Sequence, residues 1–467
     1  MRDLLVFAVV MLTLPSSFRR PFLGLLVFSW LAYMRPQDLC WGFARTMRLS
    51  FLVGLAMIVG WWANEQGRRA FARWDFRSVM MGVLTLLVTL SYLCAKFWDE
   101  YTNRYFFEFL KIILVALFTT GQVDSRQRLR VMFWTIALSL GFFGVKGGVF
   151  GLLSGGAQIL RGPGGMLEDN NDFGLALVMN VPLLWYMGLS ERRAPMMKHW
   201  TKLAVGLTVV TIVLTHSRGA FLALAATALW ISWRSGKLVR AVLVLLALAW
   251  IFPLVAPQEV LDRLSTIGDT KESSTSARLT AWAAALNMIA ANPVLGVGMR
   301  NFQMRFNEYS GAIPDESAPT YVAHNSYLQI WAESGSIAFL VYLLLLASVL
   351  VTCRRVYRLG RSRPDFAWAA DYARMMEATT IGFLIGAFFL NRGHFDLIYH
   401  WFGLVTALAG VVFAAYLRMP ATSLTKVGRR QITLRWRGRR GGASAVAMPE
   451  TDGAVAATVW RRAARWR

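Results

Sequence analysis

The residues of this chain that could do chemistry are cations and polar side chains at the ends of apolar segments. Lys146 and Arg161 flank a glycine-rich stretch that continues as Gly162-Pro-Gly-Gly-Met-Leu-Glu-Asp-Asn-Asn-Asp172. Backbone N–H groups in such a stretch, together with an arginine, can hold an anion. Asp169 and Asn171 are further candidates for substrate contacts. The alternative is a flexible loop with a snorkelling lysine and a solvated arginine.

A second candidate is Arg218 in Thr215-His-Ser-Arg-Gly219, a tight turn between two apolar segments. The turn keeps this guanidinium close to the membrane surface, where its planar fork suits phosphate. A snorkelling interfacial arginine is the alternative. Because Arg161 is expected on the same face, we favour anion binding.

The third cluster is His324-Asn-Ser-Tyr327, which opens an apolar segment, with Glu333 about two and a half turns further on. An imidazole titrates near neutral pH and can take a proton from an attacking hydroxyl. We therefore predict His324 as the catalytic residue. Tyr327 and Glu333 are candidates for substrate contacts or for packing.

The fourth cluster is the polar turn Asn391-Arg-Gly-His-Phe-Asp396. Arg392 or His394 could join the same site, although a polar turn between helices is the default interpretation. Charged residues near membrane depth are costly, and this is why all four clusters are treated as functional candidates.

Absent motifs narrow the reaction class. The sequence contains no G-x-x-x-x-G-K-[ST], no H-E-x-x-H and no Asp-x-Asp. A diphosphate leaving group needs its growing charge neutralised by a divalent metal or by fixed cations. Arginines without a metal-ligand set favour fixed cations, so neither a metal nor a cofactor is predicted.

Composition shows which elements must position these residues. Of 467 residues, 56% are hydrophobic and 16% are charged, and the mean hydropathy of +0.44 excludes a single water-soluble globular fold. Long apolar runs, from Leu4–Leu14 through Leu238–Leu254 to Trp401–Leu417, predict an all-α polytopic integral membrane protein. We expect about 12–13 transmembrane helices.

Charge gives the orientation. The chain has 50 basic and 26 acidic residues. Twenty Lys and Arg lie in the loops at 64–78, 121–130, 191–202, 234–240 and 353–377. Five lie in the alternate loops at 96–104, 147–171, 216–218 and 391–400. The first set is therefore predicted to be cytoplasmic, which puts the candidate site on the opposite, periplasmic face.

The predicted organisation has three parts. Residues 1–190 form N-terminal membrane helices, and residues 200–417 form a second membrane domain that includes a large periplasmic loop at 253–325. Short helices are expected in that loop at Ser276–Ala291 and near Asn301–Tyr309. Residues 418–467 are a basic cytoplasmic tail, predicted to be disordered and attracted to anionic lipid rather than to nucleic acid.

Several short sequence motifs, in the order in which they follow one another along the chain, resemble the O-antigen ligase and polymerase superfamily. They are Thr215-His-Ser-Arg-Gly-Ala220, Ser276-Ala-Arg-Leu-Thr-Ala-Trp282, Asn292-Pro-Val-Leu-Gly-Val-Gly298, and His324-Asn-Ser-Tyr-Leu-Gln with Glu333-Ser-Gly335. The N-terminal part resembles the O-glycosylation ligases associated with exosortase A systems. Its strings are Tyr33-Met-Arg-Pro-Gln-Asp38, Trp41-Gly-Phe-Ala44 and the glycine-rich stretch after Lys146.

The resemblance implies a GT-C-like, inverting, metal-independent glycosyltransferase of the bacterial inner membrane, with its active site facing the periplasm. The donor would be a glycan on undecaprenyl diphosphate, and the acceptor a hydroxyl on lipid A-core, a glycan or a protein. Arg161, Arg218 and Lys146 would hold the diphosphate. His324 would activate the acceptor or assist the leaving group, and Arg278 and Arg300 would be further substrate contacts.

Two other functions stay open at this point. An O-antigen or exopolysaccharide polymerase would use the same donor with a second lipid-linked glycan as acceptor. A transporter of a lipid-linked anion would show inverted repeats and broken helices at mid-membrane, and we find no convincing internal repeat. Membrane lipids are expected partners in every case.

Overall fold

The computed structural model describes residues 1–191, 194–243, 246, 273–311 and 320–419. In these ranges the chain is helical apart from its turns and loops, with one isolated β-bridge between Arg161 and Asp169. Seven of the described helices are long and apolar enough to cross a membrane. The predicted class, an all-α polytopic membrane protein, is confirmed.

The first half of the chain contains nine α-helices in the described residues. They are α1 (Arg2–Arg19), α2 (Pro21–Tyr33), α3 (Leu49–Asn64), α4 (Phe76–Leu93), α5 (Glu100–Gln122), α6 (Arg126–Leu153), α7 (Asn170–Ser190), α8 (Pro195–Leu214) and α9 (Arg218–Arg234). The second half adds α12 (Ser273–Ala291), α13 (Phe306–Tyr309), α14 (Ser326–Ser362), α15 (Ala367–Ala387) and α16 (Asp396–Leu417). Short 3₁₀ turns include η1 (Pro36–Leu39) and η3 (Gly165–Leu167).

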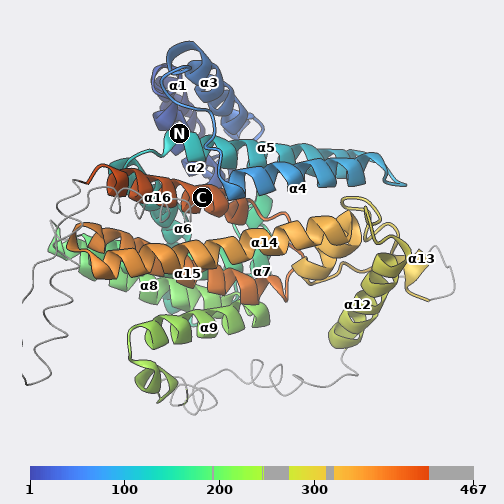
Figure 1. The fold of residues 1–467 in the computed structure, drawn as a ribbon. Helices are drawn as coiled ribbons and strands as arrows, with labels where there is room; N and C mark the ends of the chain where they lie inside the picture. The colour runs from blue at the N-terminus through green and yellow to red at the C-terminus, as the bar shows by residue number, and fades with distance from the viewer. Residues whose placement is uncertain (192–193, 244–245, 247–272, 312–319, 420–467) are drawn as a thin grey trace, which may run out of the picture.

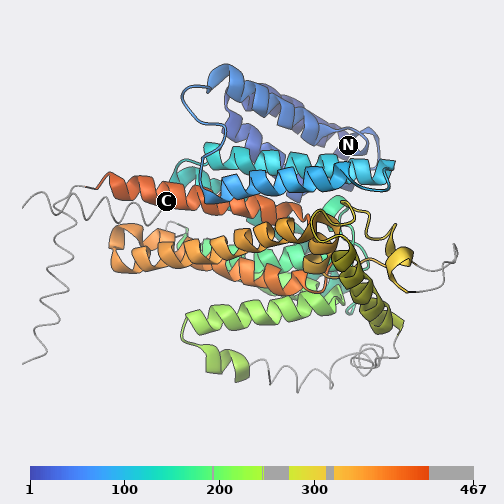
Figure 2. The same ribbon diagram turned by 45° about the vertical axis from the view of Figure 1, so that its right-hand side comes forward.

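The seven candidate spans are α4, α5, α6, α7, α8, α14 and α16. Other helices that the sequence predicts as spans are shorter, as α2, α3 and α9 are, or carry more charge, as α15 does. α9 and α15 nevertheless run alongside the long helices in both ribbon views (Figures 1 and 2). The segment Leu238–Leu254 lies largely outside the described residues, as do residues 420–467 of the basic tail.

Several helices begin at a side chain that caps their free N–H groups, and this positions the loops. Asp75, Asp99, Ser125 and Ser217 accept hydrogen bonds at the starts of α4, α5, α6 and α9. Asn325 does the same for α14 through the N–H groups of Tyr327 and Leu328. Each of these five turns therefore ends at a side chain that also fixes the start of the next helix.

The bundle has two different ends. One end, here called the loop-rich end, carries residues 34–48, 94–99, 154–169, 215–217, 388–395 and the described parts of 273–325, including α12 and α13. Figures 1 and 2 both show α12 and α13 gathered beside the start of α14 at this end. Contacts join its loops: Lys96 pairs with Glu308 at 2.7 Å, and the Asn301 amide bonds to the Phe97 backbone.

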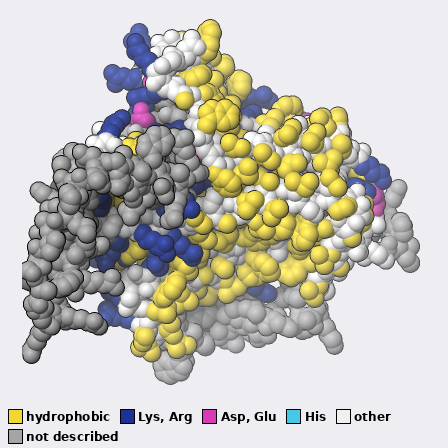
Figure 3. Space-filling model, viewed as in Figure 1, with side chains coloured by type: hydrophobic (Ala, Val, Ile, Leu, Met, Phe, Trp, Pro, Cys, Tyr) yellow, Lys and Arg dark blue, Asp and Glu magenta, His cyan; other side chains and the backbone are white. Residues whose placement is uncertain are grey.

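The opposite end, here called the basic end, collects the cation-rich loops. The ion pair between Arg69 and Asp124 links two of these loops, and Arg128 donates to the Gln122 carbonyl oxygen within one of them. Figure 3 shows hydrophobic side chains dominating the middle of one face, with Lys and Arg gathered mainly at its left. The structure thus separates the two loop sets as predicted, whereas the assignment of the basic end to the cytoplasm stays a prediction.

The core lies around α7 and α16, the two most buried of the candidate spans. α15 packs against α7, and α5 against α16. Small residues allow close helix approach: a Cβ at Gly148 of α6 would lie 2.4 Å from the Leu207 carbonyl oxygen of α8. The core spans both predicted domains, and the boundary between residues 190 and 200 stays a prediction.

Two helix boundaries in the large loop differ from expectation. α12 begins at Ser273 rather than Ser276. The second short helix is only Phe306–Tyr309, because the chain from Arg300 (φ 61°) forms turns before it. α14 is broken at Gly335 (φ 81°), where the Ser336 N–H donates to the Pro293 carbonyl oxygen. Spacing alone does not reveal this break. It lets the segment after α12 pack against the first turns of α14.

Candidate functional site

Arg161 and Arg218 lie on two loops that two hydrogen bonds tie together. The Ile159 N–H donates to the Leu214 carbonyl oxygen at 2.9 Å, and the Asn170 amide donates to that of Thr215 at 2.8 Å. Arg161 follows the first of these contacts, and Arg218 is the first residue of α9 after the turn. Both side chains are exposed at the loop-rich end. Two of the three predicted diphosphate ligands are therefore on the same end of the bundle.

The glycine-rich loop is shaped by its own backbone. The Gly162 N–H donates to the Glu168 carbonyl oxygen at 2.9 Å, next to the bridge between Arg161 and Asp169. Asp169 caps α7 by accepting from the Asn171 and Asp172 N–H groups. The geometry gives Asp169 a structural task besides any substrate contact, and it aligns Asn171 on the first turn of α7.

Arg35 is a cation at this loop that the sequence patterns did not single out. It forms an ion pair with Asp38, and a Cβ added at Gly165 would lie 2.3 Å from its Cζ atom. A Cβ at Gly164 would lie 2.8 Å from Asp38 Oδ2. Both glycines have positive φ angles (121° and 56°), which favour glycine, and both lie against this pair, so the string Tyr33–Asp38 and the glycine-rich loop form one contact surface. Counting the alternating helices from α2 to α6 could have shown that these two segments lie at the same end of the bundle.

His324 is held at the entrance of α14. Its backbone is left-handed (φ 44°), and the Trp282 indole N–H of α12 donates to the neighbouring Ala323 carbonyl oxygen at 3.0 Å. Burial lowers the pKa of the His324 imidazole, and the charge of Arg278 lowers it further, against the opposing charge of Asp169. Three of the predicted residues are therefore near enough to influence one another. Above its lowered pKa the imidazole is neutral and can accept a proton.

We predict a pH profile that reports this arrangement. Because the pKa of His324 lies below its ordinary value of 6.5, activity is expected to hold as pH falls to 6.5 and to decline only below it. Arg278→Gln removes a positive charge that lowers the pKa of His324. The decline of kcat/KM on the acid side should therefore move to higher pH. Asp169→Asn should move it to lower pH. If the acid-side decline of kcat/KM occurs at the same pH in both variants as in the unchanged protein, His324 is excluded as the titrating base.

Arg392 pairs with Asp172, a residue at the start of α7 whose side chain is only 6% exposed. Burial disfavours the charge of Arg392, but the Asp172 carboxylate outweighs this and raises the pKa of the guanidinium. The Arg392 N–H also donates to Ser326 Oγ, which donates to the Leu390 carbonyl oxygen. Arg392 thus joins the last polar turn to α7 and α14, and its guanidinium is committed to a protein carboxylate.

Glu333 and Tyr327 are part of the packing of α14. The Tyr327 hydroxyl donates to the Leu384 carbonyl oxygen of α15 at 2.8 Å. Glu333 is 2% exposed and accepts from the Gln329 amide and from the backbone N–H groups of Arg300 and Phe302. These contacts show that both side chains hold the start of α14 against its neighbours.

Arg300 and His394 approach the same buried region. The Arg300 guanidinium lies 3.9 Å from the centroid of the Tyr105 ring. Burial, with a smaller contribution from the charge of Arg300, lowers the pKa of His394 to about 3, so this imidazole is neutral. Neither of its ring nitrogens has a hydrogen-bond partner in the described part of the chain.

Lys146 differs from the other predicted cations. It is exposed on α6, about 10 Å before the helix end at Leu153. Its neighbours Gly147 and Gly148 face α8. In the ranges that the structure describes, no contact joins Lys146 to Arg161 or Arg218.

Backbone strain concentrates at this end of the molecule. Among the described residues, four that are not glycine have positive φ: Arg35, His216, Arg300 and His324. All four lie at the loop-rich end, next to the contacts above. Such conformations cost about 1–3 kcal/mol each and gather at functional sites. In the same described ranges no group of three or more His, Cys, Asp or Glu is placed to hold a metal ion.

Two protein families match this chain. Residues 203–343 match the family described as O-antigen ligase, and residues 1–190 match a family of unknown function (DUF5935). A search of curated proteins finds no match. The first segment runs from α8 into α14 and contains Arg218, Arg278, Arg300 and His324. This match places residues 203–343 in the O-antigen ligase superfamily.

Proposed function

We propose that this protein is a glycan ligase of the exosortase-associated type, which moves a glycan from undecaprenyl diphosphate to an acceptor hydroxyl at the periplasmic face. The family match supports the coarser statement, an O-antigen ligase or polymerase type of function in a multi-pass bacterial membrane protein. The observation that carries the proposed catalytic step is His324, a half-buried imidazole whose pKa is lowered by burial and which lies near enough to Arg278 and Asp169 to respond to both charges.

The proposed step is a single displacement. The acceptor hydroxyl oxygen attacks the anomeric carbon, His324 takes the hydroxyl proton, and the bond from that carbon to the diphosphate oxygen breaks. One new glycosidic bond forms with inversion, and the lipid diphosphate leaves with the electron pair. Positioned general bases of this kind typically contribute about 10²–10⁴-fold to a rate.

Fixed cations would stabilise the leaving diphosphate. Arg161 and Arg218 are exposed on loops tied by two hydrogen bonds, and we propose that one diphosphate contacts both of them. Guanidinium groups stay protonated and bind phosphate oxygens through paired hydrogen bonds. Arg278 adds positive charge beside His324 and would favour the developing anion.

A liposome assay tests the proposal. The purified full-length chain is reconstituted with an undecaprenyl-diphosphate-linked glycan and a lipid A-core acceptor. Ligase function predicts glycosylated acceptor and free undecaprenyl diphosphate in equal amounts. Lengthened lipid-linked glycan without added acceptor would instead establish a polymerase, and donor that crosses the bilayer intact would establish a transporter. Mass spectrometry of surface glycolipids and glycoproteins from a deletion strain would then identify the natural acceptor.

We also predict that transfer continues in excess EDTA. If arginines neutralise the diphosphate, chelating divalent ions removes no catalytic charge, and the rate should change less than about twofold. The rate is measured with and without chelator in the same liposomes. Loss of activity that Mg²⁺ or Mn²⁺ restores would contradict the fixed-cation mechanism.

A further inference from the structure

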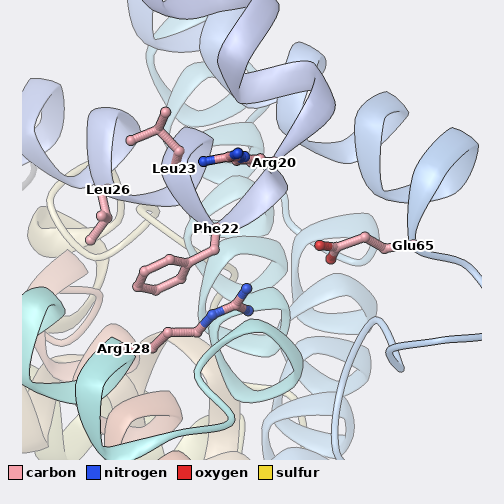
Figure 4. Close-up of a pocket in the computed structure, with 6 residues that line it drawn as sticks. All are labelled: Arg20, Phe22, Leu23, Leu26, Glu65 and Arg128. Atoms are coloured by element: carbon pink, nitrogen blue, oxygen red, sulfur yellow. The ribbon is translucent and has the colours of Figure 1, made fainter.

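A cavity of about 490 Å³ opens at the basic end, far from the proposed site along the bundle. It lies where α2 begins, between the end of α3 and the start of α6. Its lining residues are Arg20, Phe22, Leu23, Leu26, Glu65 and Arg128 (Figure 4). Nothing in the proposed glycan transfer uses this cavity.

The polar part of the lining carries an excess of positive charge. Arg128 is held by the Gln122 carbonyl oxygen at 2.7 Å and lies 3.7 Å from Asp124. Glu65 accepts from the Gln122 amide at 3.0 Å and pairs with Arg69. The carboxylates of Glu65 and Asp124 therefore each already have a cationic partner.

Arg20 is the cation without such a partner. Its side chain is exposed, and it makes no ion pair with any described carboxylate. It also stands at the N-cap of α2, whose N-terminal end favours anions. An anion at the cavity mouth would meet Arg20 and Arg128 together.

The rest of the lining is apolar. Phe22 lies under the Arg128 guanidinium, with 4.6 Å from Cζ to the ring centroid. Leu23 and Leu26 continue along α2, and Figure 4 shows Leu26 on the side away from both arginines. A ligand that fits needs an anionic head and a hydrocarbon chain. A neighbouring groove of about 430 Å³ between α1 and α3 contains only apolar residues and gives no such selectivity.

We propose that this cavity binds one anionic phospholipid, with its phosphate between Arg20 and Arg128 and an acyl chain along Leu23 and Leu26. Basic pockets between membrane helices on the cytoplasmic side, which is the side predicted for the basic end, are sites of this kind. The site is separate from His324 and does not depend on the proposed transfer reaction.

Native mass spectrometry of the purified full-length chain tests this. The protein is titrated with dioleoyl-phosphatidylglycerol, and separately with dioleoyl-phosphatidylcholine and with inorganic phosphate. We expect phosphatidylglycerol to bind preferentially and inorganic phosphate not to displace it. Arg20→Ala should weaken phosphatidylglycerol binding about fivefold, as expected for one arginine near an anionic headgroup.

Two further variants distinguish phospholipid binding in the cavity from general electrostatic attraction between the basic end and anionic lipid. Arg19→Ala removes an adjacent exposed charge that does not line the cavity, and it should leave binding nearly unchanged. Leu26→Trp fills the apolar part and should weaken the phospholipid while leaving the charges in place. Equal losses in Arg19→Ala and Arg20→Ala, or displacement of the lipid by inorganic phosphate, would overturn the proposal.

Discussion

His324→Ala is expected to lower the rate of glycan transfer by about 10²–10⁴-fold, the range for removal of a positioned general base. The loss should appear in kcat more than in KM, because the imidazole acts on the proton and does not hold the donor. Transfer is measured in the reconstituted liposomes, with folding checked by the melting temperature in detergent.

His324→Asn is the matched variant. Asparagine tolerates the left-handed backbone that His324 adopts, so this change should keep the fold while removing the base. His199→Ala, an exposed histidine at the basic end, should leave the rate unchanged. Full activity in both His324 variants would remove this residue from the mechanism.

The second large effect is expected at the ion pair between Arg392 and Asp172. Arg392→Met leaves a buried carboxylate without its cation, and breaking such a pair costs about 3–5 kcal/mol. The loss should be seen as a lower melting temperature and as reduced transfer, because the pair joins the last polar turn to α7. The double variant Asp172→Leu/Arg392→Met removes both charges and should recover most of the stability.

Lys96→Met provides the comparison at the same end of the molecule. Its pair with Glu308 is exposed on the lysine side, and exposed pairs contribute about 0–1 kcal/mol. If Arg392→Met lowers stability no more than Lys96→Met, the Asp172–Arg392 contact is not a positioning element. A double variant as unstable as Arg392→Met alone would contradict the prediction as well, because an uncompensated carboxylate would then not be the cause of the loss.

Hydropathy and charge predicted the helical bundle and the separation of its two loop sets because both properties act on whole segments. The apolar segments are predicted from the hydrophobic period and length of the runs, and the cation-rich loops from a count of Lys and Arg. The break in α14 at Gly335 could not be predicted in this way. It depends on tertiary packing: the Pro293 carbonyl oxygen accepts from the Ser336 N–H, and the Val294 carbonyl oxygen lies against Gly335.

At the candidate site the sequence predicted which loops share an end but not which side chains pair. Arg161, Arg218 and His324 were selected because their types and positions suit phosphate and proton transfer, and Arg278 was selected through the family resemblance. All four lie at the loop-rich end. Arg392 was selected by the same logic, yet its charge is taken by Asp172. Arg35 was not selected, because its contact with Gly165 joins residues more than 120 positions apart.

The contacts at the loop-rich end also limit how this protein can be recombined with its relatives. The segment that matches the family of unknown function supplies Arg35, Gly165 and Asp172, while the O-antigen ligase segment supplies His324. Arg392, the partner of Asp172, belongs to neither. A chimera that exchanges residues 1–190 alone would keep the contact between Arg35 and Gly165 but would separate Asp172 from its native partner Arg392, so a working hybrid must inherit the turn at 388–395 from the same parent.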